Sequence, residues 1–136
     1  MPKTVANPQD IARQPKGQMA IRMLAMPADT NANGDIFGGW LLSQMDIAGG
    51  VTAFQRAKGR VVTVALDAMT FHTPVTVGDI VCCYADIMRI GRTSITVGVE
   101  AWAITGAEGS RRLVTEGTFT YVAIGPDKRP RSVPAE

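Results

Sequence analysis

The segment of residues 40–58 limits most narrowly what this chain can fold into. It contains no proline, and its apolar side chains cover most of the circumference of a helix. Gly59 follows it as a C-terminal stop signal. Such a helix is roughly 28 Å long at about 1.5 Å per residue, and other elements have to enclose it because it is apolar on nearly every side. The remaining sequence must therefore supply long elements that wrap one central helix.

Five apolar segments can supply that enclosure. A short strand is expected before the helix at residues 21–25, and long strands are expected at residues 61–72, 80–90, 94–104 and 113–124. In residues 94–104 apolar and small or polar side chains alternate with a period of two, as in a half-buried strand. Short turns join these strands, which favours antiparallel pairing over a parallel α/β arrangement. We predict an α+β fold in which a curved five-stranded antiparallel sheet wraps one buried helix.

Composition and charge exclude several classes of protein. The chain has 136 residues, of which 46% are hydrophobic and 19% charged, as expected of one globular domain. Its net charge of +2 is too small to indicate nucleic acid or an anionic membrane as a partner. No apolar run approaches the ~20 residues that cross a bilayer. Cys82 and Cys83 are adjacent and would face opposite sides of a strand, so we expect reduced thiols and no disulfide.

The two ends of the chain differ in composition from its centre. Residues 1–18 lack the apolar core of a secretory signal, so we expect a flexible leader and a cytoplasmic protein. Residues 19–125 form the single predicted domain. Residues 126–136 make a basic, proline-rich tail that is expected to pack little.

Asp46 is the most unusual residue of the predicted helix. It lies in the second turn of an otherwise apolar segment, where an unpaired buried carboxylate is costly and has to titrate, pair or react. Its neighbours at helical spacing are small: Gly39, Ser43, Gly49 and Gly50. A glycine inside a helix costs roughly 1 kcal/mol relative to alanine. We infer that another group approaches the helix backbone closely beside Asp46.

Most familiar catalytic motifs are missing from the sequence. His72 is the one histidine, and no cysteine spacing suits zinc. The chain has no G-x-S-x-G elbow and no glycine-rich loop for dinucleotides or nucleotide phosphates. The remaining candidate chemistry is a carboxylate assisted by polar side chains and backbone amides.

Two segments carry a specific resemblance. The sequences DTNANGDIFGGWLLSQMD and GRVVTVALDAMTFHTPVTVGDIV resemble the hotdog-fold acyl-CoA thioesterases of the YciA type. The resemblance extends over residues 19–134. It implies the hotdog fold and hydrolysis of an acyl-CoA thioester to a free fatty acid and CoA, without a metal or an organic cofactor.

The resemblance also implies roles for individual residues. Asp46 corresponds to the family's catalytic aspartate, and Asn31 to an asparagine that acts on it from a neighbouring subunit. The dimers of the family share active sites in this way and usually assemble into a hexamer, a trimer of dimers. Asp46 acts either as a general base on water or as a nucleophile, which the sequence leaves open. The backbone amides of Gly38 and Gly39 at the helix start suit the developing oxyanion of the thioester.

Further residues are candidates for substrate binding. The phosphates of CoA call for basic and hydroxyl side chains, for which we name Arg60, Arg92, Thr93 and Ser94, with Arg89, Lys128, Arg129 and Arg131 as further cations. Ser43, one turn before Asp46, either contacts the substrate or bonds back to its own helix. Phe37, Trp40 and Phe71 are candidates for shaping the acyl tunnel. No catalytic role is expected for His72 at a strand end.

Two alternative functions have to be compared with this sequence. Hotdog hydratases of one class carry a histidine five residues after the aspartate, whereas Val51 occupies that position here. The alternative of a different class is a non-catalytic acyl-CoA-binding regulatory module. Such a module would not need Asp46 and Asn31, and both are present. The acyl chain length stays open.

Overall fold

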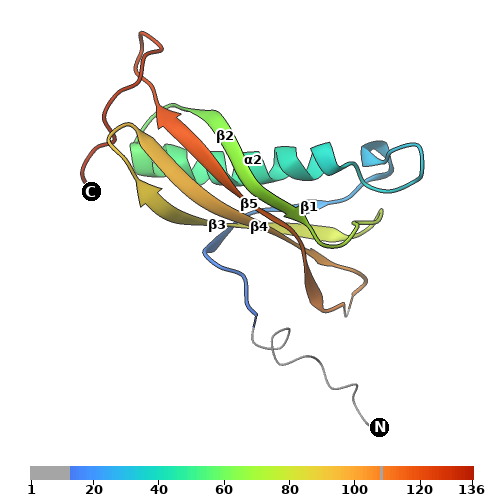
Figure 1. Ribbon diagram of the computed structural model, residues 1–136. Helices are drawn as coiled ribbons and strands as arrows, with labels where there is room; N and C mark the ends of the chain where they lie inside the picture. The colour runs from blue at the N-terminus through green and yellow to red at the C-terminus, as the bar shows by residue number, and fades with distance from the viewer. Residues whose placement is uncertain (1–12, 108) are drawn as a thin grey trace.

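The computed structural model describes residues 13–107 and 109–136 as one long helix against one curved sheet (Figure 1). The elements are β1 (Gln18–Leu24), the 3₁₀-helix η1 (Pro27–Asp29), α2 (Gly38–Ala57), β2 (Val61–Phe71), β3 (Ile80–Ile90), β4 (Ser94–Ile104) and β5 (Arg111–Ala123). All neighbouring strands are antiparallel, in the order β1-β3-β4-β5-β2. The predicted fold class is confirmed. No helix of the described residues is long and apolar enough to cross a membrane.

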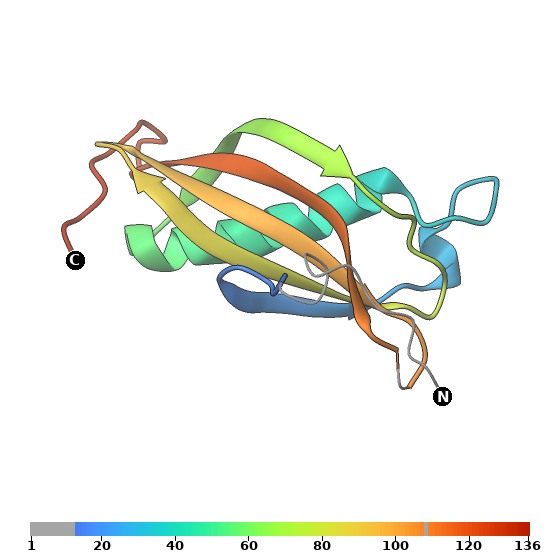
Figure 2. The same cartoon turned by 60° about the horizontal axis from the view of Figure 1, so that its bottom comes forward.

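The core lies between α2 and one face of the sheet, along which the helix runs in Figure 1 and Figure 2. Leu41, Met45 and Ala48 are buried on the helix. In β4 the alternation is confirmed, because every second residue belongs to the core: Ile95, Val97, Val99, Ala101 and Ala103. Each large aliphatic side chain buried in this way stabilises the fold by roughly 1.5–3 kcal/mol.

The sheet covers only one side of α2. Ile47, Val51 and Phe54 on the opposite side are 50%, 41% and 53% exposed, which is high for apolar side chains. The prediction that other elements enclose the helix is therefore only half met within one chain. An apolar stripe on the open side of α2 is left uncovered.

Some element ends differ from those predicted. β1 begins at Gln18, three residues before the predicted strand. α2 begins at Gly38, at the predicted helix start and two residues before the apolar segment of residues 40–58. The helix ends where Lys58 takes left-handed backbone angles (φ 54°) and the Gly59 amide donates to the Phe54 carbonyl at 3.2 Å. In β2 the register shifts between Asp67 and Thr70.

Packing begins earlier in the chain than the sequence indicates. Residues 1–12 of the expected leader lie outside the described residues. Arg13, however, is 3.0 Å from Glu116 and 3.3 Å from Glu100, measured from its Nη2 to carboxylate oxygens. The Lys16 amide also donates to Glu100, at 3.2 Å. Residues 13–17 therefore lie across the face of the sheet that points away from α2.

The tail after β5 also packs, contrary to expectation. The Arg131 amide donates to Ala123, and the Val133 amide donates to Arg92. The Arg131 side chain donates to the Ala57 carbonyl at 2.9 Å and to the Ile124 carbonyl at 3.2 Å. The Arg131 guanidinium, placed beside the end of α2, satisfies a carbonyl that the helix leaves unpaired and complements the helix dipole.

Loss of this contact is expected to destabilise the protein. Replacing Arg131 with alanine removes charge-assisted hydrogen bonds to two carbonyls, so we expect the free energy of unfolding to fall by about 2 kcal/mol. Urea unfolding measures it. The matched control is Arg129→Ala, whose exposed side chain lies on the same tail and should change stability little. Equal effects of the two substitutions would contradict the anchoring role.

Asp79 explains the PV-x-VGD part of the quoted motif. Its side chain is 1% exposed and accepts hydrogen bonds from the Thr76 amide (2.9 Å), the Thr105 hydroxyl (2.7 Å) and Arg112 (2.9 Å). Arg112 also donates to the Pro74 carbonyl, at 3.1 Å. Burial by itself would raise the pKa of Asp79, but these hydrogen bonds and the charge of Arg112 outweigh it and lower the pKa below 3.8. This network ties the turn before β3 to the hairpin between β4 and β5.

Candidate active site

Asp46 lies where α2, β2 and β5 meet. The Thr63 hydroxyl on β2 donates to Asp46 Oδ1 at 2.8 Å. The Tyr121 hydroxyl on β5 is 3.0 Å from the same Oδ1 and 2.9 Å from the main-chain oxygen of Asp46. The side chain is half-buried, and among the described residues no arginine, lysine or histidine pairs with it. The arrangement is that of a carboxylate held by neutral donors, not that of a structural ion pair.

The two oxygens of the Asp46 carboxylate are in different situations. Oδ1 accepts from Thr63 and Tyr121, whereas Oδ2 has no hydrogen-bond partner within the part of the chain that the structure describes. Burial, followed by the nearby negative charge of Asp46, raises the pKa of Tyr121, so its phenol stays protonated and acts as a donor. Oδ2 is thus the oxygen available for chemistry.

The structure shows what lies next to each of the small residues around Asp46. A Cβ on Gly49 would collide with the Tyr121 hydroxyl, so the group that approaches this glycine is a side chain of the same chain. A Cβ on Gly50 would make only an ordinary contact, 3.7 Å from the Tyr121 ring. The Ser43 hydroxyl donates to the Trp40 carbonyl at 2.8 Å, so it bonds back to its own helix.

The start of α2 offers uncapped amides. Within the part of the chain that the structure describes, no side chain caps the helix at Phe37, and a Cβ on Gly39 would meet no atom within 4 Å. A Cβ on Gly38 would lie 3.5 Å from the Phe71 ring, beside a shallow hollow that Phe71 and His72 help to line. Phe37 and Phe71 are exposed here, whereas Trp40 packs against the core. The N–H groups of the first turn are therefore free to bind a negatively charged oxygen.

Asn31 organises the loop before α2. Its Oδ1 accepts from the amides of Asn33 at 2.9 Å and Asp35 at 3.1 Å, and its own amide donates to the Asp35 carbonyl at 2.7 Å. Asn31 Nδ2 donates no hydrogen bond to any of the described residues, which leaves it as a donor for another group. The structure does not bring Asn31 to Asp46. The loop lies beyond the start of α2 in Figure 1, and Asp46 lies about 12 Å along the helix from Gly38.

The four residues proposed for CoA binding gather at the opposite end of the molecule. The Ile124 amide donates to the Arg60 carbonyl, the Ala123 amide to Thr93 and the Val133 amide to Arg92. The Ser94 carbonyl accepts from the Gly91 amide at 2.8 Å and so closes the hairpin between β3 and β4. Lys58, Arg60 and Arg131 line one hollow here, beside the end of α2. This end carries the tail and the β3–β4 hairpin in Figure 1.

Other titratable groups are engaged elsewhere. His72 Nε2 is 2.7 Å from Glu116 Oε2, and burial, which alone would raise the pKa of Glu116, is outweighed by hydrogen bonds from His72 and Arg13 that lower it. Cys82 and Cys83 are free and buried, and burial, with a smaller contribution from Cys82, raises the pKa of Cys83 to about 12. The Cys83 thiol is therefore unreactive at neutral pH.

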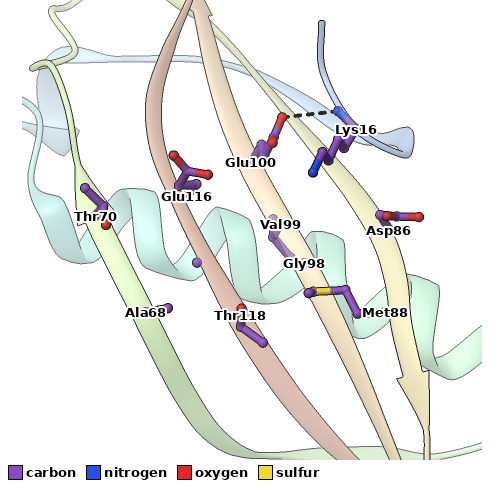
Figure 3. Close-up of a pocket in the computed structure, with 11 residues that line it drawn as sticks. Lys16, Ala68, Thr70, Asp86, Met88, Gly98, Val99, Glu100, Glu116 and Thr118 are labelled. Atoms are coloured by element: carbon purple, nitrogen blue, oxygen red, sulfur yellow. Dashed lines mark hydrogen bonds between the residues drawn. The ribbon is translucent and has the colours of Figure 1, made fainter. Parts of the chain in front are cut away.

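The far face of the sheet holds a separate hollow of about 310 Å³. Figure 3 shows Asp86, Glu100, Glu116 and Thr118 on this face, with α2 on the other side of the strands. Asp46 does not line it. The hollow therefore does not belong to the site around the carboxylate.

Sequence reasoning missed two residues of the site, Thr63 and Tyr121. Thr63 and Tyr121 are partners across the β2–β5 pairing, on the face that points to α2. The alternation in residues 118–123 places Tyr121 on the core side of its strand, but only the register with β2 brings the two hydroxyls together. Thr63 lies in the second quoted segment but does not stand out from the other residues of its strand, and Tyr121 lies outside both quoted segments.

A curved five-stranded antiparallel sheet packed around one long helix defines the hotdog class of protein. Residues 33–110 match the family described as the thioesterase superfamily. The chain belongs to this superfamily, which confirms the resemblance stated from the sequence.

Relatives with more than half of their residues identical to this chain are named as thioesterases. The chain is 54% identical to the acyl-CoA thioester hydrolase YciA of Salmonella typhimurium over 125 residues, 90% of this chain and 94% of that protein. Its structure superposes on a hexameric thioesterase from Yersinia pestis with a TM-score of 0.86 at 54% identity, covering 90% of this chain and all of the other.

A more distant structure bears on the site. The acyl-CoA hydrolase of Staphylococcus aureus, solved with butyryl-CoA and CoA, has a TM-score of 0.78 at 29% identity and covers 85% of this chain and 70% of its own. Alanine variants of one aspartate and one threonine of that enzyme have been solved, and the two positions are 17 residues apart. Asp46 and Thr63 have the same separation of 17.

Proposed function

We propose that this protein is an acyl-CoA thioesterase that hydrolyses acyl-CoA to a free fatty acid and CoA, with Asp46 as its reacting carboxylate. The observation that carries the proposal is the geometry of Asp46. Two neutral hydroxyls hold Oδ1, and among the described residues no cation pairs with the group and Oδ2 has no hydrogen-bond partner. The names of the relatives supply the substrate class.

The open oxygen allows two chemical routes. In the first, Oδ2 takes a proton from a water molecule as that water attacks the thioester carbonyl. In the second, Oδ2 attacks the carbonyl itself and forms a mixed anhydride that water then hydrolyses. Either route ends with the C–S bond broken, and the departing CoA thiolate takes up a proton.

The carbonyl oxygen becomes negative in both routes, and we assign its stabilisation to the backbone amides of Gly38 and Gly39. Because Gly38 lies about 12 Å along the helix from Asp46 of the same chain, we assign these amides to the neighbouring protomer of a dimer. Each well-placed donor of this kind lowers the barrier by roughly 3 kcal/mol. Nδ2 of Asn31 supplies a further hydrogen bond to the carbonyl or to the water. Because Asn31 and Asp46 lie apart in one chain, we assign Asn31 to the neighbouring protomer of a dimer.

The surface around Asp46 supports such a dimer. β2 is an edge strand of 11 residues, and its Val64 and Leu66 are exposed. The apolar stripe of Ile47, Val51 and Phe54 is also uncovered. Long apolar edge strands are normally paired or covered, and Thr63 of this strand touches Asp46. A second copy seated here would bring its own residues to the carboxylate, and by analogy with the Yersinia relative we propose a hexamer built as a trimer of dimers.

We place the phosphates of CoA at the basic end of the molecule. Asp46 and Lys58 are 12 residues apart on one helix, or about 18 Å, a span that suits the extended pantetheine arm. Arg60 and Arg92 with Thr93 and Ser94 lie at that end. Replacing Arg60 with alanine should therefore raise KM for acyl-CoA about tenfold, because a charge-assisted contact is lost.

A truncated substrate provides the control for that substitution. The N-acetylcysteamine thioester of the same acyl group lacks the phosphates, so its KM should be the same for Arg60→Ala and the wild type. A rise in KM for both substrates would contradict the assignment of Arg60 to the phosphates.

Thiol release from a panel of acyl-CoAs, from acetyl-CoA to palmitoyl-CoA, tests the proposed function. Catalytic release from at least one member, with a chain-length optimum, is the expected result. A folded protein that binds acyl-CoA without releasing thiol would instead be a binding module.

A further inference from the structure

We propose that Tyr121 is a positioning residue for Asp46 and that residue 49 is glycine because the Tyr121 hydroxyl occupies the space of a side chain there. The inference rests on the proposed role of Asp46. Tyr121 lies on β5, whereas the residues assigned to the substrate lie on α2, its preceding loop and the basic end of the molecule.

The contacts of the Tyr121 hydroxyl involve both the backbone and the side chain of one residue. Its oxygen is 2.9 Å from the Asp46 main-chain oxygen and 3.0 Å from Asp46 Oδ1. A donor shared between these two acceptors restricts rotation of the carboxylate about its side-chain bonds. It thereby fixes the direction in which Oδ2 points.

Tyr121 is rigid enough to perform this task. It is 1% exposed, and its ring stacks on Phe119 with centroids 6.4 Å apart and planes inclined by 13°. Thr63, which shares the same Oδ1, is exposed on the edge strand β2. We therefore assign the positioning of the carboxylate to the buried Tyr121 phenol and not to the exposed Thr63 hydroxyl.

Gly49 completes the arrangement. A Cβ at this position would collide with the Tyr121 hydroxyl and lie 3.1 Å from two ring carbons. Any larger side chain would push the phenol away from Asp46. Gly50, at the next position, would accept a Cβ at an ordinary 3.7 Å from the same ring. The need for glycine is thus specific to residue 49.

Tyr121→Phe is the first test. The ring and its stacking remain, so the protein should fold, while kcat for acyl-CoA hydrolysis should fall about tenfold with KM unchanged. The acidic limb of the kcat profile should move to higher pH, because a hydrogen bond to an ionised carboxylate favours the ionised form. The matched control is Tyr84→Phe, which removes a hydroxyl bonded to Arg111 and should leave both kcat and the pH profile unchanged.

Gly49→Ala provides a second, independent variant. It should lower kcat by displacing the hydroxyl, and it should lower it little further when Tyr121→Phe is already present. Gly50→Ala is its control and should leave the pH profile as in the wild type. Losses from Gly49→Ala and Tyr121→Phe that multiply would show that the two residues act separately and would overturn the proposal.

Wild-type turnover separates this inference from the function on which it rests. If the wild type releases no thiol from any acyl-CoA, the proposed function fails. If the wild type is active and Tyr121→Phe keeps its kcat and its pH profile, only the positioning role is overturned.

Discussion

Replacing Asp46 with asparagine should lower kcat for acyl-CoA hydrolysis by about three orders of magnitude, because the variant lacks a base or nucleophile. Asparagine has nearly the same shape, and its side-chain oxygen can still accept from Thr63 and Tyr121. The fold and the assembly should therefore remain. Thiol release under saturating substrate measures kcat, and size-exclusion chromatography checks the assembly.

Asp86→Asn is the matched control for this substitution. Asp86 is an exposed carboxylate on the face of the sheet that points away from α2. Its neutralisation changes the net charge by the same amount and should leave kcat unchanged. Near-normal turnover by Asp46→Asn would show that another group performs the chemistry.

The largest expected effect on stability belongs to Asp79. Replacing it with alanine removes three hydrogen-bond acceptor contacts and leaves the Arg112 guanidinium without its buried partner. We expect the free energy of unfolding at pH 7 to fall by about 3 kcal/mol. Urea unfolding measures the change, and Asp86→Ala on the strand that follows, β3, is the control.

The pH dependence of stability gives a second readout for Asp79. The native pKa of this group is lowered, so its contribution is fully present above the ordinary value of 3.8 and is lost as the pH falls through the native value. Below about pH 4 the wild type should lose stability faster than Asp79→Ala does. Parallel losses in the two proteins would contradict the assignment of the shifted pKa to this network.

The sequence predicts the fold well because its patterns are local. The apolar circumference of residues 40–58 and the period of two in residues 94–104 each follow from the geometry of one element. The packed tail was missed because its anchor is Arg131, whose guanidinium meets Ala57 across 74 positions. No local pattern marks a surface arginine as a helix cap.

The site divides in a similar way. Asp46 stands out in the sequence because a carboxylate in an apolar helix is rare, and Asn31 lies in the quoted motif. Thr63 and Tyr121 lie 17 and 75 positions from Asp46, and only the register of β2 against β5 places them beside it. The inference from the small residues was right that a group approaches the helix, but that group is Tyr121. The prediction that other elements enclose α2 is met on one side only, because we assign the other side to contacts between protomers. The sequence pattern of one chain does not show which chain supplies the covering element.

The most direct test of a shared site is complementation between Asp46→Asn and Asn31→Ala. Each variant alone should be strongly impaired. In the first variant every site lacks Asp46, which one protomer supplies, and in the second every site lacks Asn31, which the other protomer supplies. Random mixing, by refolding together or by co-expression, makes half of the dimers hybrid, and each hybrid has one site with both native residues. Thiol release should then recover to about one quarter of the wild-type rate for a two-fold symmetric dimer. A mixture no more active than the average of the two variants would contradict the account, because Asp46 and Asn31 would then act within one chain or not at all.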